Sequence, residues 1–272
     1  MSKKILSWRV PVLASFIVFM TIPIIATGIF SISTRWDRTL WPEGLTLNWW
    51  LKVTARSTFF DTLLNSFWVA TLTVAVSLAI IVPAAFLVHT RVNRAKPLLE
   101  FLSIAPFSMP GVVFAVSLLR LYSMVPLPIV NTPNILVAAY VTITLPFMYR
   151  PVMNALESIN IKNLTEAAEI LGANSFQTFL LIVIPNITRG IISGSLLVFS
   201  AVFAEFVLAN LLIGTRFKTF PIYLVEFTRL DARQASALAM MSFAIAWLIT
   251  LGVLWILAGN NKISAREHHS KT

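Results

Sequence analysis

Six long apolar segments divide this chain, and they constrain its fold more than any other feature. An apolar helix of about 20 residues spans the hydrocarbon core of a bilayer, and most of these segments reach that length. Backbone groups inside a bilayer must be satisfied within the protein, which favours helices. We therefore expect an all-α, polytopic membrane protein with a single transmembrane domain over residues 1–272. The expected spans are residues 10–32, 63–88, 98–122, 135–152, 187–213 and 235–257.

The composition agrees with a membrane protein. Apolar residues make up 57% of the chain and charged residues only 12%, whereas soluble domains are about a quarter charged. The formal charge of +10 would suit nucleic acid, but in a membrane protein it reflects basic residues at the membrane surfaces. We therefore expect a lipid bilayer as partner and no nucleic acid. With no cysteine in the chain, neither disulfides nor a thiolate metal site are expected.

Residues 160–185 form a polar, helix-forming island between two apolar segments. Apolar residues recur there with the spacing i, i+3, i+4, i+7, which predicts two short amphipathic helices. Gly172 is expected to end the first helix, Ser175 to cap the second, and Pro185 to end it. The two apolar faces are Leu164, Ala167, Ala168 and Leu171, then Phe176, Phe179, Leu180 and Val183. The helices would form a compact knob; the alternative is an ordinary surface loop.

Three groups of residues in the island carry a recognisable spacing: the triplet Glu166-Ala167-Ala168, then Gly172 after three residues, then IVIP at 182–185 after nine more. This pattern closely resembles the EAA motif, EAA-x3-G-x9-I-x-L-P, of the permease subunits of bacterial ABC importers. Ile184 is the one departure, since leucine is usual at that place. The wider resemblance runs from roughly residue 65 to residue 257.

In that family the motif forms a cytoplasmic coupling helix that inserts into a groove of the ATPase subunit. The resemblance therefore implies a type I importer permease fold in which the residues 160–185 dock on the ATPase. The coupling residues so implied are Leu164, Glu166, Ala167, Ala168, Leu171, Gly172, Phe176, Phe179, Ile182 and Pro185.

The resemblance also implies partners and a mechanism. A solute-binding protein would deliver solute to the outer face of two permease subunits, this chain and a second copy or a paralogue. Two ABC ATPase subunits would bind ATP and Mg²⁺, and their closure would push the coupling helices and rock the spans by alternating access. This chain itself would bind no cofactor.

The orientation of the chain follows from its two ends and from the motif. Residues 10–32 follow Lys3, Lys4 and Arg9, as in a secretory signal, but the run is too long and lacks a small-x-small cleavage site. We expect an uncleaved first span in the bacterial inner membrane, with both termini cytoplasmic. Cations are only slightly more numerous in the expected cytoplasmic segments than outside them, so the orientation rests mainly on the coupling motif.

Residues 33–60 are rich in tryptophan and follow the first span. Tryptophan favours the membrane interface, so we expect an extracytoplasmic loop lying on the surface. A docking surface for the solute-binding protein is the alternative. The four tryptophans are Trp36, Trp41, Trp49 and Trp50. A second extracytoplasmic connection is expected at residues 123–134.

Prolines and glycines mark special places within the spans. Pro106 and Pro110 break the third span, and Pro83 is expected to interrupt the second. Because breaks at depth are tolerated where protein or a cavity covers the freed backbone, Pro106 and Pro110 are candidates for the translocation pathway, with plain kinking as the alternative. Gly190 and Gly194 would let a neighbouring helix approach closely, although this spacing alone is a weak signal.

Glu205 is the one acidic residue deep in an apolar span. A carboxylate near the bilayer centre costs roughly 2.5 to 3.5 kcal/mol, so its side chain should face the bundle interior. It is a candidate, with Asn210, to line the pathway and to accept a cationic solute. The alternatives are a structural hydrogen bond, with Asn210 or with another span, or a place at the outer gate.

No catalytic motif is visible, and in particular no G-x4-G-K-[ST] loop for phosphates. The chain is thus expected not to be an enzyme, and ATP would be hydrolysed by a partner. The stretches FAEFVLANLL, TFPIYLVEF and RWDRTLWPEGLTLNWW look most like permeases for polyamines, aminoethylphosphonate and ferric iron. Putrescine, spermidine or 2-aminoethylphosphonate is favoured, with ferric iron or thiamine as alternatives. A channel or secondary transporter working without ATP is the alternative from another class.

Overall fold

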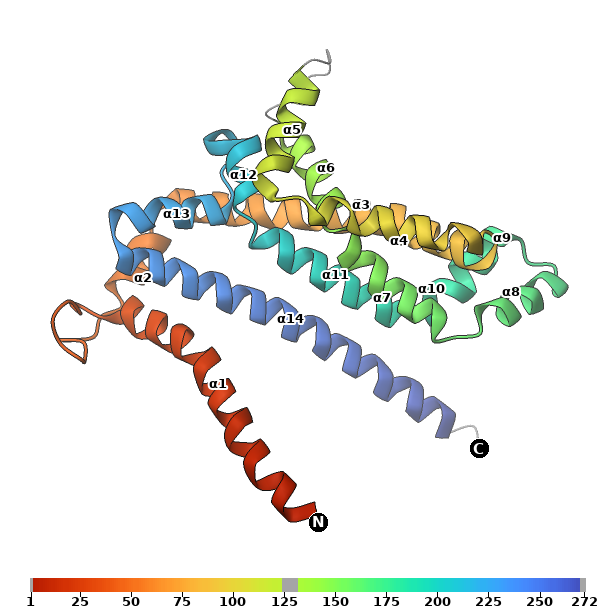
Figure 1. Cartoon of the computed structure of the whole chain (residues 1–272), viewed down its shortest axis with the longest axis horizontal. Coiled ribbons are helices and arrows are strands. Elements are labelled where there is room, and N and C mark those ends of the chain that lie inside the picture. The colour runs from red at the N-terminus through yellow and green to blue at the C-terminus, as the bar shows by residue number, and fades with distance from the viewer. Residues whose placement is uncertain (1, 124–131, 270–272) are drawn as a thin grey trace. The chain divides into compact units, whose positions relative to one another are not determined.

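The computed structural model describes residues 2–123 and 132–269. Side chains are described for these residues except 2–7, 9, 162 and 256–269. The described residues are mostly helical, and their only strand-like feature is an isolated bridge between Ser33 and Leu45. Figure 1 shows this all-α architecture, which confirms the expected class. The connection expected at residues 123–134 lies largely outside the described residues.

The helices vary widely in length, and short turns join several of them. The α-helices are α1 (Ser2–Ile32), α2 (Asn48–Thr54), α3 (Ser57–Thr90), α4 (Lys96–Ile104), α5 (Gly111–Ser123), α6 (Pro133–Ile143), α7 (Leu145–Glu157), α8 (Ile161–Ile170), α9 (Ser175–Thr178), α10 (Ile184–Asn186), α11 (Thr188–Phe203), α12 (Val207–Leu212), α13 (Phe220–Leu230) and α14 (Ala232–His269). Three 3₁₀ turns, Asn93–Ala95, Pro106–Ser108 and Gly214–Phe217, and one π-helical turn, Phe179–Val183, complete the described helical segments.

Three helical segments are long and apolar enough to cross a membrane alone: Val10–Ile32 in α1, Ser57–Thr90, and Ala232–Trp255 in α14. Three further candidates are helix pairs bent by more than 40° at a short break. The bends are 99° between Asn93–Ser108 and Gly111–Ser123, 47° between Pro133–Ile143 and Leu145–Glu157, and 74° between Ser175–Asn186 and Thr188–Phe203. If each bent pair is one span, the described residues hold up to six, as expected.

Two of the expected spans have different boundaries in the structure. Pro83 does not interrupt the second span, because α3 runs unbroken from Ser57 to Thr90. A proline is tolerated inside an apolar helix where neighbouring groups satisfy the freed carbonyl. The fifth expected span is not one helix, because α11 ends at Phe203 and α12 begins at Val207. The physical reason for the break between α11 and α12 is the side chain of Glu205, described below.

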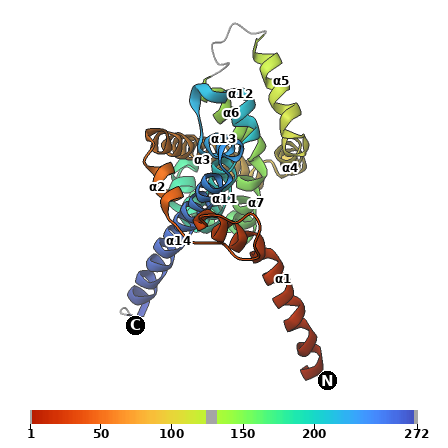
Figure 2. The ribbon, with the colours of Figure 1, turned by 90° about the vertical axis from the view of Figure 1, so that its left-hand side faces the viewer.

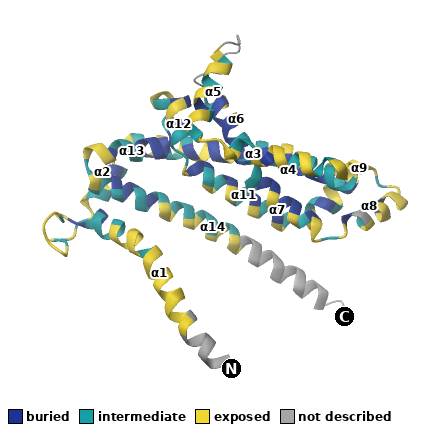
Figure 3. Ribbon diagram, in the orientation of Figure 1, coloured by how far each residue is buried: buried dark blue, intermediate teal, exposed yellow. Residues whose placement is uncertain are grey.

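Contacts divide the chain into two compact units, residues 1–60 with 223–272 and residues 61–222. In the first unit α1 packs along α14, and α2 packs on both. Figures 1 and 2 show α1 and α14 close together near α2 and separating toward their free ends. Figure 3 shows α1 largely exposed, and its described exposed side chains are apolar except for Ser15, as suits a helix that faces lipid or another apolar surface. The expected single domain stays a prediction.

In the first unit a cationic cluster ties the tryptophan-rich segment to the start of α14. The guanidinium of Arg233 lies 4.4 Å from the ring centroid of Trp49, and the Lys52 ammonium lies 4.7 Å from it. Arg233 also donates to the Thr34 carbonyl at 2.7 Å and pairs with Asp231 at 3.3 Å. Burial raises the pKa of Asp231, but hydrogen bonds and the positive charge of Arg233 outweigh burial and lower it overall. Asp231 therefore keeps its charge. Residues 48–54, which were expected in a loop, form the helix α2.

The second unit is built around α7 and α11, which approach closely at two glycines. A Cβ on Gly190 would lie 2.5 Å from the Ala155 Cβ and 2.6 Å from the Pro151 carbonyl oxygen. A Cβ on Gly194 would lie 2.9 Å from the Met148 sulfur. The expected close approach is thus confirmed. Figure 3 shows buried residues concentrated along these helices; the large, fully buried side chains here include Leu136, Tyr140, Met148, Tyr149, Leu156, Ile187 and Leu208.

Candidate coupling site

The polar island contains two helical segments, and the first is α8. The Asn160 side chain caps it by accepting a hydrogen bond from the Asn163 amide at 3.3 Å. Ala168 is buried and Leu164 half-buried, but Ala167 and Leu171 are exposed. Only half of the face predicted from the apolar spacing therefore packs inward, because a short helix at the edge of the unit leaves its tip in solvent.

Gly172 ends α8 as expected. Its φ of 83° lies in the left-handed region, which glycine adopts without steric cost. The Gly172 amide donates to the Glu169 carbonyl at 3.0 Å, and the Ala173 amide donates to the Ala168 carbonyl at 3.0 Å. This pair of bonds is a Schellman motif, which satisfies the last carbonyls of a helix. The chain thereby turns sharply toward the second segment.

The second segment begins at Asn174, and the prediction that Ser175 caps it is wrong. The Asn174 side chain accepts from the Gln177 amide at 2.8 Å, and the Gln177 side chain accepts from the Asn174 amide at 3.0 Å. This capping box satisfies two amides reciprocally. Ser175 is the first residue of α9, and its hydroxyl accepts a hydrogen bond from Arg91 instead. Asparagine at 174 and glutamine at 177 were the available signal for this cap.

Asn174→Ala should loosen the start of this segment. Loss of an asparagine cap costs about 1 kcal/mol, so the Gln177 amide should exchange with deuterium roughly fivefold faster. Hydrogen exchange with mass spectrometry over the peptide containing Gln177 measures this. Asn163→Ala is the matched control, because it makes the same substitution at an exposed position of α8 and leaves the capping box intact. Equal exchange rates for both variants would contradict the assignment of the cap.

The second segment ends close to the expected residue. After α9 comes the π-helical turn Phe179–Val183 and then α10, so the chain stays helical to Asn186. Pro185 lies one residue before that end, so the expected stop agrees with the structure to within one residue. Val183 is fully buried, Phe179 and Ile182 are half-buried, and Phe176 is 69% exposed. The predicted second face is therefore only partly buried: Phe176 lies before the π turn at the exposed tip, and the π turn shifts the helical register of the residues after it.

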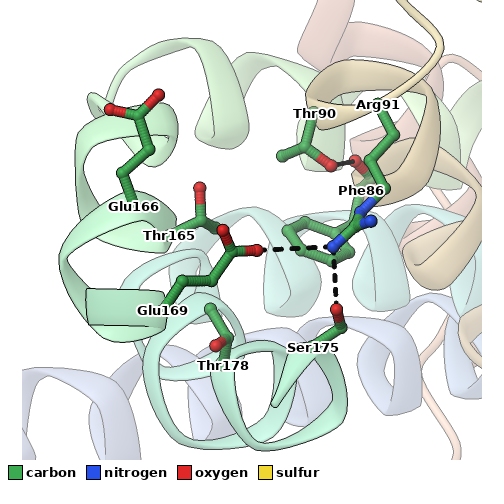
Figure 4. A pocket seen from close by; sticks show the side chains of 8 residues that line it. All are labelled: Phe86, Thr90, Arg91, Thr165, Glu166, Glu169, Ser175 and Thr178. Carbon is green, nitrogen blue, oxygen red and sulfur yellow. Dashed lines mark hydrogen bonds and ion pairs between the residues drawn. The ribbon is translucent and has the colours of Figure 1, made fainter. Parts of the chain in front are cut away.

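Arg91, at the end of α3, links both helical segments of the island (Figure 4). One guanidinium nitrogen lies 3.4 Å from a Glu169 carboxylate oxygen on α8 and donates to the Ser175 hydroxyl on α9 at 2.8 Å. The Phe86 ring of α3 packs on Phe179, with centroids 5.2 Å apart. These groups border a pocket of about 240 Å³. An exposed ion pair contributes only about 0.2 to 1 kcal/mol, so the ring contact and the hydrogen bond add substantially to the link.

The tip of the island presents apolar side chains to solvent. Ile170 is 86% exposed, Leu171 is 88% exposed and Phe176 is 69% exposed, and they lie around the turn at Gly172. Figure 4 shows the carboxylate of Glu166 turned away from Arg91. Adjacent apolar side chains that no residue of the same chain covers are typical of a surface that binds another protein.

Two of the breaks in the second unit lie close together. Pro106 lies in the 3₁₀ turn Pro106–Ser108, and Pro110 directly precedes α5. A Cβ on Gly111 would lie 3.8 Å from a Val207 methyl at the start of α12. Pro110, next to Gly111, is therefore close to the break at residues 204–206. The role of Pro106 and Pro110 in lining a pathway stays a prediction.

Glu205 lies in the break between α11 and α12, and its carboxylate holds that break together. It accepts hydrogen bonds from the Leu208 amide at 3.0 Å, from the Ala209 amide at 3.3 Å and from the Tyr140 hydroxyl at 2.9 Å. Tyr140 belongs to α6, so the bond joins two spans. Asn210 is exposed, and the hydrogen bonds of Glu205 go to Tyr140 and the α12 amides instead. This geometry fits the structural alternative, with another span as the partner.

Sequence reasoning missed Arg91 as a member of the coupling site. Nothing local in the sequence shows that residues 91 and 169, which are 78 residues apart, meet. Ile170 was also missed, since it falls outside the predicted apolar face of α8. The predicted coupling residues lie on α8, at the turn at Gly172, or along the second segment, and their role in coupling stays a prediction.

The chain matches both a protein family and individual relatives. A family model for the inner membrane component of binding-protein-dependent transport systems matches residues 81–260. The spermidine/putrescine transport system permease protein PotB of Escherichia coli (strain K12) is 31% identical over 179 residues, covering 58% of this chain and 62% of PotB. The chain thus spans about three fifths of PotB. The putrescine transport system permease protein PotI of the same strain is 24% identical over 267 residues, covering 96% of this chain and 94% of PotI.

Solved structures show the same fold. A chain of a bacterial ABC transporter involved in the import of the acidic polysaccharide alginate matches with a TM-score of 0.73 and 20% identity, covering 93% of this chain and 96% of that chain. The alginate transporter in complex with a pentasaccharide-bound periplasmic protein matches with a TM-score of 0.70, 16% identity and 91% coverage of both chains.

Proposed function

This chain belongs to the family of binding-protein-dependent transport system inner membrane components, and on that premise we propose that it is the permease subunit of an ABC importer for a small cationic solute, best a polyamine. The coupling site carries the first half of this proposal. Ile170, Leu171 and Phe176 are exposed apolar side chains around the turn at Gly172, and an ATPase subunit is the occupant that the EAA spacing predicts. ATP and Mg²⁺ would be bound by two such subunits and not by this chain.

The remaining partners follow from the same premise. A second permease subunit, identical or a paralogue, would complete the pathway, and a solute-binding protein would deliver solute from outside. Both termini would be cytoplasmic, because the coupling site must face the ATPase. The solved relative that is in complex with a periplasmic protein supports the binding-protein partner.

Leu171→Asp should release the ATPase from the complex. A charge placed at the centre of an apolar contact costs about 2 kcal/mol or more, which is roughly a thirtyfold loss of affinity. The amount of ATPase that co-purifies with the tagged chain from detergent-solubilised membranes measures this. Folding should be unaffected, because the side chain is 88% exposed.

Leu40→Asp is the matched control, since Leu40 is 91% exposed and lies in the other compact unit. It introduces the same charge on an equally exposed leucine and should leave co-purification unchanged. If Leu171→Asp kept a normal amount of ATPase, or if the unaltered chain captured none, the coupling assignment would fail. A channel or carrier without ATP would then be the better interpretation.

The solute is the second half of the proposal. PotB and PotI are named as permeases for spermidine and putrescine, which supports a polyamine over 2-aminoethylphosphonate, ferric iron or thiamine. ATP hydrolysis by the complex in nanodiscs, with binding protein loaded with each solute in turn, tests the choice. Stimulation by polyamine-loaded protein alone supports it; stimulation by another loaded form would replace polyamine with that solute.

A further inference from the structure

The segment before the first break of the second unit lies along α7 and is fastened to it at three points. Lys96 forms an ion pair with Glu157, and the Glu100 carboxylate lies 2.9 Å from the Arg150 guanidinium. Each ion pair joins α4 to α7. Further along, the Phe107 ring packs edge-on against Phe147, with centroids 5.4 Å apart.

These three contacts run in antiparallel order. As the chain proceeds from residue 96 to 100 to 107, its partners recede from 157 to 150 to 147. The ladder therefore begins at the end of α7 that leads into α8, and it finishes in the 3₁₀ turn Pro106–Ser108.

The two ion pairs have opposite polarity, and this fixes how α4 sits along α7. Lys96 is a cation on α4 that faces an anion, whereas Glu100 is an anion that faces a cation. If α4 slid along α7 until Lys96 approached Arg150, two cations would meet, and attraction would become repulsion. The two exposed ion pairs therefore favour the observed register of α4 along α7, and the packing of Phe107 on Phe147 adds to this preference.

We propose that this ladder is the transmission element that carries displacement of the coupling site to the break at residues 106–110. Glu100 and Arg150 are its positioning residues. The inference rests on the proposed function, since it needs an ATPase that moves residues 160–185. That movement would enter α7 through the short link at residues 158–160, pass across the ladder to α4, and change the angle between α4 and α5, which is 99° in the structure.

Spin labels on α4 and α5 measure this angle directly. The chain contains no cysteine, so Leu102→Cys and Leu121→Cys, both at exposed positions, provide two unique labelling sites. The distance between the labels is recorded in the purified complex with its ATPase, with and without ATP. We expect a shift on adding ATP, and we expect Arg150→Glu to remove it while ATP hydrolysis stays within about twofold, because coupling and hydrolysis are separate quantities.

Two further variants separate transmission from simple destabilisation. The exchange Glu100→Arg with Arg150→Glu restores opposite charges and should restore the shift. Arg94→Glu makes the same change of charge at an exposed position just before α4 and should leave the shift intact. Should Arg150→Glu fail to accumulate, Glu100→Gln, which removes one charge without reversing it, takes its place and should reduce the shift.

Every other result contradicts either the ladder or the proposed function. A shift that survives both Arg150→Glu and Glu100→Gln overturns the ladder, and so does an exchange that restores nothing or an Arg94→Glu variant that is equally impaired. A complex that retains its ATPase but shows no ATP-dependent shift overturns it too. If the unaltered chain retained no ATPase, the proposed function itself would fail, and the inference with it.

Discussion

Gly190→Val is expected to prevent the chain from accumulating as a folded protein in the membrane. Any Cβ at this position would lie 2.5 Å from the Ala155 Cβ and 2.6 Å from the Pro151 carbonyl oxygen. Neither atom is the end of a flexible side chain, so α7 and α11 would have to separate. Overpacking of this kind costs about 3 kcal/mol or more, and the packing of α7 against α11 is the centre of the second unit.

Two other glycines calibrate this expectation. Gly194→Ala should be milder, because its Cβ would first meet the Met148 sulfur, which can rotate away. Gly252→Ala in α14 should be neutral or slightly stabilising, since nothing lies within 4 Å of its Cβ and alanine favours a helix. Membrane abundance and the melting temperature in detergent measure all three variants. Equal behaviour of the variants at 190 and 252 would refute the close approach of α7 and α11.

Glu205→Ala is expected to have the second-largest effect. It removes the acceptor for the Leu208 and Ala209 amides and for the Tyr140 hydroxyl. Tyr140 is 1% exposed, and a buried polar group left without a partner costs about 1 to 3 kcal/mol. The start of α12 should fray and its contact with α6 should loosen. The melting temperature of the purified protein should fall, and uptake should fall with it.

Two conservative variants separate a structural role of Glu205 from solute binding. Glu205→Gln keeps an oxygen for the amides, so a structural role predicts that most of the stability and most of the uptake of labelled putrescine remain. Tyr140→Phe removes the hydrogen bond between the spans and should lower the melting temperature moderately. If Glu205→Gln melted normally but lost putrescine uptake, the carboxylate would be needed for the solute, and the structural role alone would not suffice.

The coupling turn could be predicted from the sequence because its signals are local. Gly172 needs no distant partner to adopt a positive φ, and the apolar spacing before it marks a helix. The wrong prediction at Ser175 also concerns local signals, since Asn174, one residue earlier, takes the cap and forms two reciprocal hydrogen bonds with Gln177. The apolar runs likewise predicted six spans, because span length depends on bilayer thickness.

The breaks and the long-range contacts could not be predicted in the same way. A proline breaks α4 from α5 at Pro106 and Pro110 but leaves α3 intact at Pro83, since the outcome depends on what surrounds the freed carbonyl. The break at Glu205 arises because its carboxylate accepts hydrogen bonds from the Leu208 and Ala209 amides, and a count of apolar residues does not detect such bonds. Arg91 and Glu169 are 78 residues apart, and no periodicity reveals such a pair.

The π-helical turn Phe179–Val183 determines the direction of the side chains that follow it in the chain. A π turn holds one residue more than an α-helical turn, so deleting a single residue there would let the helix continue as a regular α-helix. Later side chains would keep their directions, because the π turn already holds the additional residue within one turn of the helix. If the same residues were instead wound as a regular α-helix, every later side chain would rotate by about 100° about the helix axis. Val183, now fully buried, would then turn out of the core. The π turn thus preserves the direction of the following span although the segment carries one additional residue.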